Sequence, residues 1–292
     1  MELRVLRYFL EVAQEKNITH AAHNLLVSQP TLSTQLADLE DELGAKLFIR
    51  GPRELTLTAE GEYLKAHATE IVTLANKTAA NIQSNQVVSG SLTIGAGESI
   101  QMRRIVKVLA NMIQDYPDVK LHFISGNADE METKLELGIL DFAVFMGERP
   151  LDNYNHLRLS EYDQWVVVMS KEAPLAKKKV IEPADLVGLP LTMSQQALKE
   201  HRFQTWWGDL DAEMNIVATF TLAFNAQLLV SEGNTYMITF EHLVSDVLKN
   251  ELVCVPLKPA LKEPITIVWK KNTVLSKAAQ LFIQRLTAST EI

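Results

Sequence analysis

The sequence is poor in cysteine and has no long run of apolar residues. Its 292 residues include a single cysteine, Cys254, so no disulfide can form within the chain. No stretch approaches the roughly 18 consecutive apolar residues of a membrane-spanning helix. The N-terminal residues interleave acidic, basic and apolar side chains, and no small-residue cleavage site follows them, unlike a secretory signal. We therefore expect a protein of the reducing cytoplasm, with no membrane partner.

The sequence also lacks the basic surplus that is common in nucleic-acid-binding proteins. It contains 28 Lys and Arg against 36 Asp and Glu, a net charge of -8, which argues mildly against such partners. Residues 1–58 share this acidic balance, but the acids between Asp38 and Glu42 are grouped at the far end of a predicted helix. Because the placement of charge matters more than its sum, the near end of that helix remains available to an anionic partner.

The first part of the chain predicts three short helices. Apolar side chains recur at helical spacing in residues 1–14 and again in residues 18–26. Ser28 can cap a third helix, Pro30 is tolerated in its first turn, and Gly44 suits its end. These signals are local, so we expect the three helices close to these bounds.

A hairpin follows the third helix. Residues 46–50 and 54–57 form two short β-type runs around the turn at residues 51–53, which contains glycine and proline. Three helices and a hairpin in so short a segment predict an all-α winged helix-turn-helix domain over residues 1–58.

The first turns of the third helix carry short polar groups. The side chains opposite its leucine face are Gln29, Thr31, Ser33, Thr34 and Gln35. Such groups at a helix N-terminus can enter the major groove of DNA and bond base edges or phosphates, and the free amides there favour a phosphate. This end of the helix is therefore the predicted DNA-reading surface.

The N-terminal segment resembles the DNA-binding domain of LysR-type transcriptional regulators. The resemblance runs from Met1 to Gly61 and is carried by Phe9, Val12, Ala13, Ala21, Ala22, Leu25, the run from Ser28 to Ser33, Leu36, Leu39, Glu40, Leu43, Gly44, Leu47, Phe48, Arg50, Leu57 and Thr58. It implies a periplasmic-binding-protein-like sensor of two subdomains behind the reader, and dimers or tetramers on double-stranded DNA.

The resemblance also assigns roles to single residues. The DNA contacts that it implies are Gln29, Pro30, Ser33 and Arg53, with Arg50 on a phosphate. Thr31 and Thr34 complete the predicted DNA site, although Thr34 stands where many members carry arginine. Near Gly233 the sequence departs from the common family pattern, so the loop lining the sensor pocket can differ here.

Residues 59–90 predict one long helix followed by a hinge. The apolar positions that alternate in steps of four and three are Leu64, Ala68, Ile71, Ala75, Thr78 and Ile82. Such a stripe can pack on its own domain or against another chain. Because no other partner for it is evident in the small reader domain, we favour a second copy of the chain, in a homo-oligomer.

Residues 91–292 predict an effector-binding α/β domain. The strand candidates are residues 92–95, 120–125, 142–145, 165–169, 191–193, 216–221, 237–240, 252–255 and 265–269. The helix candidates are residues 100–114, 128–137, 198–208, 225–231, 242–249 and 276–286. This alternation predicts mostly parallel sheets with helices on both faces. We expect subdomain I over about 91–161 and 265–292 and subdomain II over about 162–264, with crossings near Glu161 and Pro264.

A ligand of such a domain binds in the crevice beyond the strand C-termini. The residues near those ends that we select as candidate effector contacts are Ser99, Asn127, Met193, Ser194, Phe224 and Thr239. Ser99 could bond a ligand carboxylate or serve only as a helix cap, and the sequence leaves both readings open. The neighbouring Glu98 would repel an anion, which leaves room for an uncharged or cationic effector.

The sequence therefore predicts a ligand-responsive transcription regulator. It carries no phosphate loop, nucleophile elbow or zinc-protease motif, so we expect no enzyme, cofactor or metal. A solute-binding protein with a helical extension and an enzyme on the α/β domain are the alternatives. The expected partners are promoter DNA, a small-molecule effector and a second copy of the chain, with RNA polymerase as a further candidate.

Overall fold

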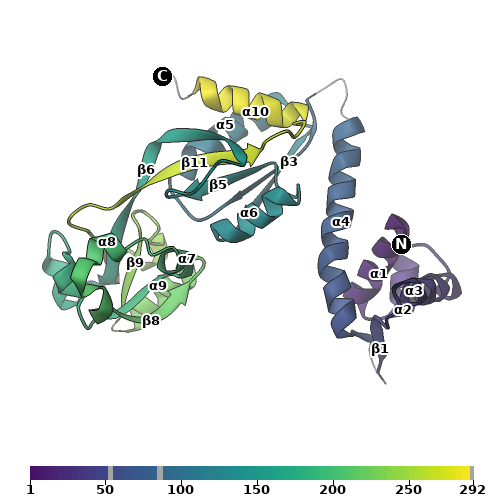
Figure 1. Cartoon of the computed structure of the whole chain (residues 1–292), viewed down its shortest axis with the longest axis horizontal. Coiled ribbons are helices and arrows are strands. Elements are labelled where there is room, and N and C mark those ends of the chain that lie inside the picture. The colour runs from purple at the N-terminus through teal and green to yellow at the C-terminus, as the bar shows by residue number, and fades with distance from the viewer. Residues whose placement is uncertain (52–54, 84–87, 234, 290–292) are drawn as a thin grey trace. The chain divides into compact units, whose positions relative to one another are not determined.

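A computed structural model describes residues 1–51, 55–83, 88–233 and 235–289. The chain forms two compact units, Met1–Asn85 and Gln86–Ile292 (Figure 1). Among the described residues, no helix combines the length and the apolar character needed to cross a lipid bilayer.

The first unit contains the predicted helices and hairpin. Its elements are α1 (Leu3–Glu15), α2 (Ile18–Asn24), α3 (Gln29–Leu43), β1 (Phe48–Arg50), β2 (Leu55–Leu57) and α4 (Ala59–Gln83). The Asn17 side chain accepts hydrogen bonds from two amides of α2, and Ser28 caps α3 by accepting from the Thr31 amide. Gly44 ends α3 in the left-handed conformation, at φ 66°. Local caps and stops thus place these helices where the sequence predicts them.

The first unit closes on a small apolar core. The fully buried side chains include Phe9, Leu32 and Leu39, and the rings of Phe9 and Phe48 lie 5.3 Å apart. This core fixes the angle between α2 and α3, so it sets the direction in which the first turn of α3 points.

The hairpin is tied to α3 by one carboxylate. Glu40 accepts hydrogen bonds from the Leu47 amide at 2.8 Å and the Phe48 amide at 3.4 Å, and it pairs with Lys46 at 2.7 Å. Burial tends to raise the pKa of Glu40, but Lys46 and the two amides outweigh it, so the pKa is lowered. Glu40, one of the acids that make this unit negatively charged, therefore holds the hairpin against α3.

The long helix α4 divides its apolar stripe between two environments. Leu64, Ala68 and Val72 pack against the core of the first unit. Ile71 is 42% exposed and Ile82 is 64% exposed. The prediction that the stripe lacks a partner in its own domain was wrong for the first turns, because α1 packs there against α4.

The second unit is built on one sheet of nine strands in the order β4-β3-β5-β11-β6-β9-β7-β8, with β10 on β6. The strands are β3 (Gly90–Ala96), β4 (Val119–Ser125), β5 (Phe142–Met146), β6 (Tyr154–Ser170), β7 (Pro190–Ser194), β8 (Asn215–Phe220), β9 (Tyr236–Phe240), β10 (Leu252–Pro256) and β11 (Lys262–Lys270). The helices are α5 (Met102–Asp115), α6 (Ala128–Glu136), α7 (Gln195–Lys199), α8 (Gln204–Trp207), α9 (Ala223–Glu232) and α10 (Lys277–Ala288).

Two long antiparallel strands join the halves of this unit. Strands β6 and β11 pair from Lys270 with Tyr154 to Lys262 with Gln164, and they run through both halves (Figure 1). Parallel pairs flank them, β3 with β4 and β5 in one half and β7 with β8 and β9 in the other. The sheet is therefore mixed rather than mostly parallel, because the strands that cross run against their neighbours.

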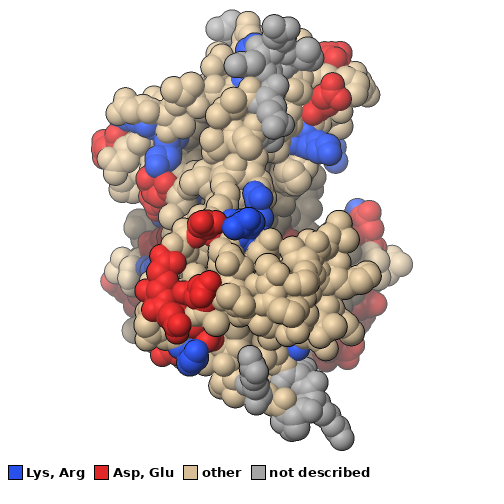
Figure 2. Space-filling view, turned by 90° about the vertical axis from the view of Figure 1, so that its right-hand side faces the viewer, with Lys and Arg blue, Asp and Glu red and all other residues tan. Residues whose placement is uncertain are grey.

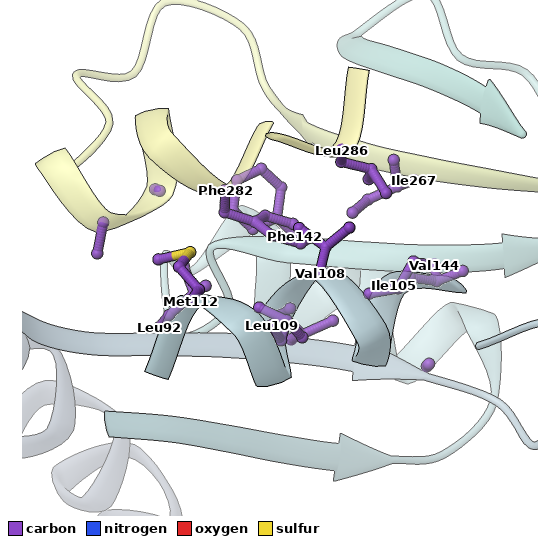
Figure 3. Close-up of a cluster of buried hydrophobic side chains, with 14 of the residues drawn as sticks. Leu92, Ile105, Val108, Leu109, Met112, Phe142, Val144, Ile267, Phe282 and Leu286 are labelled. Carbon is purple, nitrogen blue, oxygen red and sulfur yellow. The ribbon is translucent and has the colours of Figure 1, made fainter. Parts of the chain in front are cut away.

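Each half has its own core. In the first, α5 and α10 cover the sheet, and Phe142 and Phe282 meet at a ring distance of 5.0 Å within the cluster drawn in Figure 3. In the second, Trp165, Phe203 and Trp207 form a buried aromatic cluster. Two packed cores joined by a pair of strands leave a crevice between them.

Two predicted helices differ from the structure. The single helix expected over 198–208 is divided into α7 and α8, because His201 adopts a positive φ of 52° that a helix cannot continue through. The helix expected over 242–249 is reduced to the 3₁₀ turn Asp246–Leu248, preceded by His242 at φ 67°. Both breaks place loop backbone near the crevice.

Candidate functional site

The first turn of α3 presents a polar and exposed surface. Gln29, Pro30 and Thr31 are exposed and Ser33 is half-buried. The Gln29 Nε2 donates to Ser33 Oγ at 2.8 Å, and the hydroxyls of Ser28 and Thr31 are 2.7 Å apart. These side chains thus form a compact set of donors and acceptors around a capped helix start. Their mutual hydrogen bonds can be replaced by hydrogen bonds to a nucleic acid.

The remaining predicted DNA contacts have different surroundings. Thr34 is exposed on the same helix. Arg50 is the last residue of β1, and its side chain lies outside the described part of the structure. Arg53 lies wholly outside the described residues. Figure 2 shows acidic side chains gathered on one side of the face that it draws, beside a wide area without charged side chains.

A crevice of the second unit lies between its two halves. It holds about 790 Å³ of empty space, its open mouth included. The residues that line it come from strands, helix starts and loops of both halves: Gly97, Glu98, Gly126, Asn127, Ala128, Val144, Met146, Trp165, Ser194, Gln195, Gln196, Ala197, Glu200, Arg202, Phe220, Thr221, Ala223, Thr239, Phe240, Leu243 and Glu263. A small molecule there would touch both halves at once.

The predicted effector contacts fall into three places. Asn127, Ser194 and Thr239 line the crevice. Ser99 and Phe224 line an adjoining depression that shares Gly97 and Glu98 with it. Met193 is fully buried and faces another depression, beside Phe203 and Trp207.

The polar groups that sequence reasoning missed come from several distant segments. Arg202 donates from Nε to Glu200 Oε2 at 2.8 Å, and from Nη2 to the Glu148 carbonyl at 2.9 Å. Its Nη1 lies 3.4 Å from Glu263 Oε2, while Trp165 Nε1 donates to Glu263 Oε1 at 3.1 Å. Glu200 is two residues from Arg202 in the sequence, but Glu263 is 61 residues away, so no local pattern connects Glu263 to Arg202.

Hydrogen bonds also cross the crevice from one half to the other. The Glu98 carboxylate accepts from the Ala223 amide at 2.5 Å, at the start of α9. The Gln196 side chain accepts from the Ala128 amide at 2.8 Å, at the start of α6. Arg149 donates to Glu200 at 3.0 Å. These bonds hold the two halves together around the crevice.

Two buried acids lie where the long strands cross between the halves. Asp163 on β6 is paired in register with Glu263 on β11. Burial, reinforced by the charge of Glu263, raises the pKa of Asp163 to about 6. Burial also raises the pKa of Glu263, although Trp165 and Arg202 lower it. Glu263 lines the crevice, whereas Asp163 lines a neighbouring depression beside Gln101 and His242.

The chemistry of these residues is that of binding. In the described part of the chain, no three His, Cys, Asp or Glu residues are grouped to hold a metal ion. The thiol of Cys254 lies half-buried in β10, and burial, followed by the charge of Glu241, raises its pKa. A thiol with a raised pKa is a weak nucleophile near neutral pH.

Two family models together match almost the whole chain. The model described as a bacterial regulatory helix-turn-helix protein of the lysR family matches residues 3–62. The model described as the LysR substrate binding domain matches residues 85–291. The two matches correspond to the reader unit and to the unit that contains the crevice.

Relatives match over the full length as well. The Hca operon transcriptional activator HcaR of Escherichia coli (strain K12) is 30% identical, over 93% of this chain and 98% of its own. A probable RuBisCO transcriptional regulator of Trichormus variabilis is 26% identical, over 98% of this chain and 86% of its own. The solved structure of full-length CbnR complexed with its target DNA has the same fold, with a TM-score of 0.75 at 20% identity over 99% of this chain and 100% of that chain.

Proposed function

The chain belongs to the LysR family of bacterial transcription regulators, and on this premise we propose which residues read DNA and which hold the effector. As a member it is a DNA-binding regulator with an effector-binding domain, not an enzyme. We assign DNA binding to residues 1–58, linkage and self-association to 59–90, and effector binding to 91–292. Within the last, subdomain I covers about 91–161 and 265–292, and subdomain II about 162–264.

The start of α3 is the proposed reading surface. The observation that supports it is the exposed pair of Gln29 and Ser33, whose mutual hydrogen bond can be replaced by bonds to base edges. Pro30, Thr31 and Thr34 would contact bases or sugar–phosphate beside them. By family resemblance, the two wing arginines, Arg50 and Arg53, would contact the backbone and the groove.

A gel-shift experiment tests this surface. The probe is the intergenic DNA beside the chain's own gene, with unrelated DNA as competitor. Gln29→Ala with Ser33→Ala should weaken specific binding by about 1–3 kcal/mol per lost contact, while binding to unrelated DNA stays nearly constant. Gln14→Ala, at an exposed position of α1, is the matched control. Unchanged specific binding in the double variant would place the reading surface elsewhere.

The crevice is the proposed effector site. Asn127, Ser194 and Thr239 offer an amide and two hydroxyls from both halves of the unit, and Ser99 lies in the adjoining depression. Trp165 and Phe240 would supply apolar surface. Such a mixture of apolar wall and few polar groups is typical of small-molecule sites.

Self-association is proposed through α4 and the second unit. Ile71, Leu74 and Ile82 leave an apolar stripe exposed on α4. Further exposed apolar side chains lie on α9, where Phe224 is 51% exposed and Leu229 44%. Exposed apolar groups gathered on one helix face are typical of protein interfaces. A dimer or tetramer would bring two reading helices to one operator.

The crossing hydrogen bonds suggest how an effector would act. Glu98 with Ala223, and Gln196 with Ala128, would both be altered by a ligand that enters between the halves. The effector can shift the arrangement only by the difference in its affinity for the two states. Because α4 connects reader to sensor in the chain, a changed packing of the sensor would alter the spacing of two reading helices in the oligomer.

A further inference from the structure

The arginine that lines the crevice is already bonded by the chain's own oxygen atoms. Arg202 donates to Glu200 at 2.8 Å and lies 3.4 Å from Glu263. It also donates to the Glu148 carbonyl at 2.9 Å, and it lies so close to Gly147 that a Cβ atom there would come within 2.6 Å of its Cζ. Among the described residues that line the crevice, Arg202 is the only basic one. An anionic ligand would therefore have to displace a carboxylate of the chain to reach a positive charge.

The acids that line the crevice have partners as well. Glu98 accepts from the Ala223 amide at 2.5 Å, and Glu263 accepts from the Trp165 indole at 3.1 Å. Glu200 is bonded to the arginine described above. A cationic ligand would have to compete with these donors, and an anionic ligand would be repelled by the acids. The crevice thus offers a charged ligand, of either sign, only groups that already have a partner.

Two helix starts at the crevice are also satisfied by side chains of the chain. The Ala223 amide belongs to α9, where it donates to Glu98, and the Ala128 amide of α6 donates to Gln196 at 2.8 Å. Helix N-termini usually attract anions because their first amides lack a partner. Here the side-chain oxygens take that place, so these amides do not favour an anionic ligand.

A buried hydroxyl of the crevice is different, because nothing in the described part of the chain is hydrogen-bonded to it. Thr239 lies on β9, is 2% exposed and lines the crevice. Most buried hydroxyls in proteins are hydrogen-bonded, so an unpaired one in the wall of a cavity points to a bound partner. A hydroxyl both donates and accepts, and its partner needs no charge.

Apolar side chains from both halves complete the wall. Val144 and Met146, on β5, come from the first half. Phe220, Phe240 and Leu243 come from the second. An apolar ligand body placed among them would gain about 25 cal/mol for each Å² removed from water. Such a wall selects a ligand by its shape and by a few hydrogen bonds.

We propose that the effector is an uncharged small molecule, an apolar or aromatic body with one hydroxyl or carbonyl group, and that this group binds the Thr239 hydroxyl. The body would lie between Met146 of one half and Phe240 and Leu243 of the other. This inference rests on the proposed effector role of the crevice, and it names the chemical class that the crevice takes.

The test compares ligands of similar size that differ in charge. Full-length protein is melted with benzyl alcohol, benzamide, benzylamine or benzoate, and with the same four groups on a cyclohexyl and on a naphthyl scaffold. On at least one scaffold a neutral ligand should raise the melting temperature in a concentration-dependent way. Its amine and carboxylate counterparts should not.

Three variants locate the binding. Thr239→Val removes the hydroxyl and keeps the shape, so the neutral ligand should bind about 3- to 10-fold more weakly, as expected for one lost hydrogen bond between neutral groups. Thr239→Ser keeps a hydroxyl and should keep most of the affinity. The matched control is Thr192→Val on β7: Thr192 is 1% exposed, its hydroxyl also lacks a partner among the described residues, and it does not line the crevice. This control should bind like wild type.

The outcomes separate this inference from the proposed function. Stabilisation by amines or carboxylates alone would overturn the uncharged class and leave the crevice as an effector site. Neutral ligands whose affinity survives Thr239→Val, or a series without any stabilising neutral member, would overturn it as well. If a neutral ligand binds through Thr239 but leaves the promoter footprint and transcription in vitro unchanged, the ligand class stands and the effector function itself fails.

Discussion

Replacing Asp163 with asparagine should stabilise the second unit at alkaline pH and have little effect at acidic pH. Burial, with the charge of Glu263, raises the pKa of Asp163 from 3.8 to about 6. A folded protein that holds a proton more tightly than the unfolded chain loses stability as the pH rises between those two values. Above about pH 6 the ionised carboxylate therefore carries its full cost. Asparagine has the shape of the protonated acid and avoids that cost at every pH.

The size of the effect follows from the shift. Each pKa unit corresponds to about 1.36 kcal/mol, so a difference of about two units gives an upper limit of about 3 kcal/mol near pH 8. For a domain of this length, each kcal/mol moves the melting temperature by roughly 2–4 °C. The gain should shrink steadily on acidification and vanish near the ordinary pKa of an aspartic acid.

The tryptophans make the assay specific. All four, Trp165, Trp206, Trp207 and Trp269, lie in the second unit, so their fluorescence reports its unfolding alone. Urea titrations of wild type and Asp163→Asn at about pH 8 and about pH 5 should show a clearly larger gap in midpoint at the higher pH. Asp118→Asn, at an exposed position just before β4, should show no gap at either. A variant less stable than wild type at both values would refute the reasoning, because it would mean that the carboxylate is stabilised by partners.

Three further predictions concern the first unit. Ile71→Asp with Ala75→Asp should dissociate the oligomer in analytical sedimentation, since unpaired charges in an apolar interface are unfavourable. Thr73→Asp, on the opposite face of α4, should leave the oligomer intact. An intact oligomer in the double variant would contradict the α4 interface. Glu40→Ala should cost about 1–3 kcal/mol by leaving two amides without their acceptor, measured by circular dichroism melts; an unchanged melt would mean that the hairpin is held otherwise. Gly44→Ala should lower the free energy of unfolding by about 1–2 kcal/mol in the same melts. The cost comes from the backbone, because φ of Gly44 is +66° while a Cβ there would meet no atom within 4 Å. An unchanged melt would show that α3 can end in another conformation.

The elements of the first unit follow from local chemistry. Asn17 and Ser28 accept hydrogen bonds from amides in the first turns of α2 and α3, and Gly44 ends α3. All of these interactions span only a few residues, so the sequence predicts the bounds of α2 and α3 almost to the residue. The same holds for most strands of the second unit, whose apolar runs end at turn residues. The breaks at His201 and His242 were missed, because a positive φ in a non-glycine residue is imposed by packing and leaves no local signal.

The crevice could not be read in the same way. Ser99, Asn127, Ser194 and Thr239 were selected because strands of an α/β domain carry ligand contacts at their C-termini, which is a rule of topology. Whether such a residue faces the crevice or the core depends on side-chain direction, and Met193 lies in the core. The sequence by itself determined the helix-turn-helix, the long helix and the α/β character, because hydrophobic periodicity and caps act over a few residues. Only the tertiary structure brought Arg202 to Glu263 and placed Asp163 opposite it, because those contacts join segments about 60 to 100 residues apart through strand register and packing.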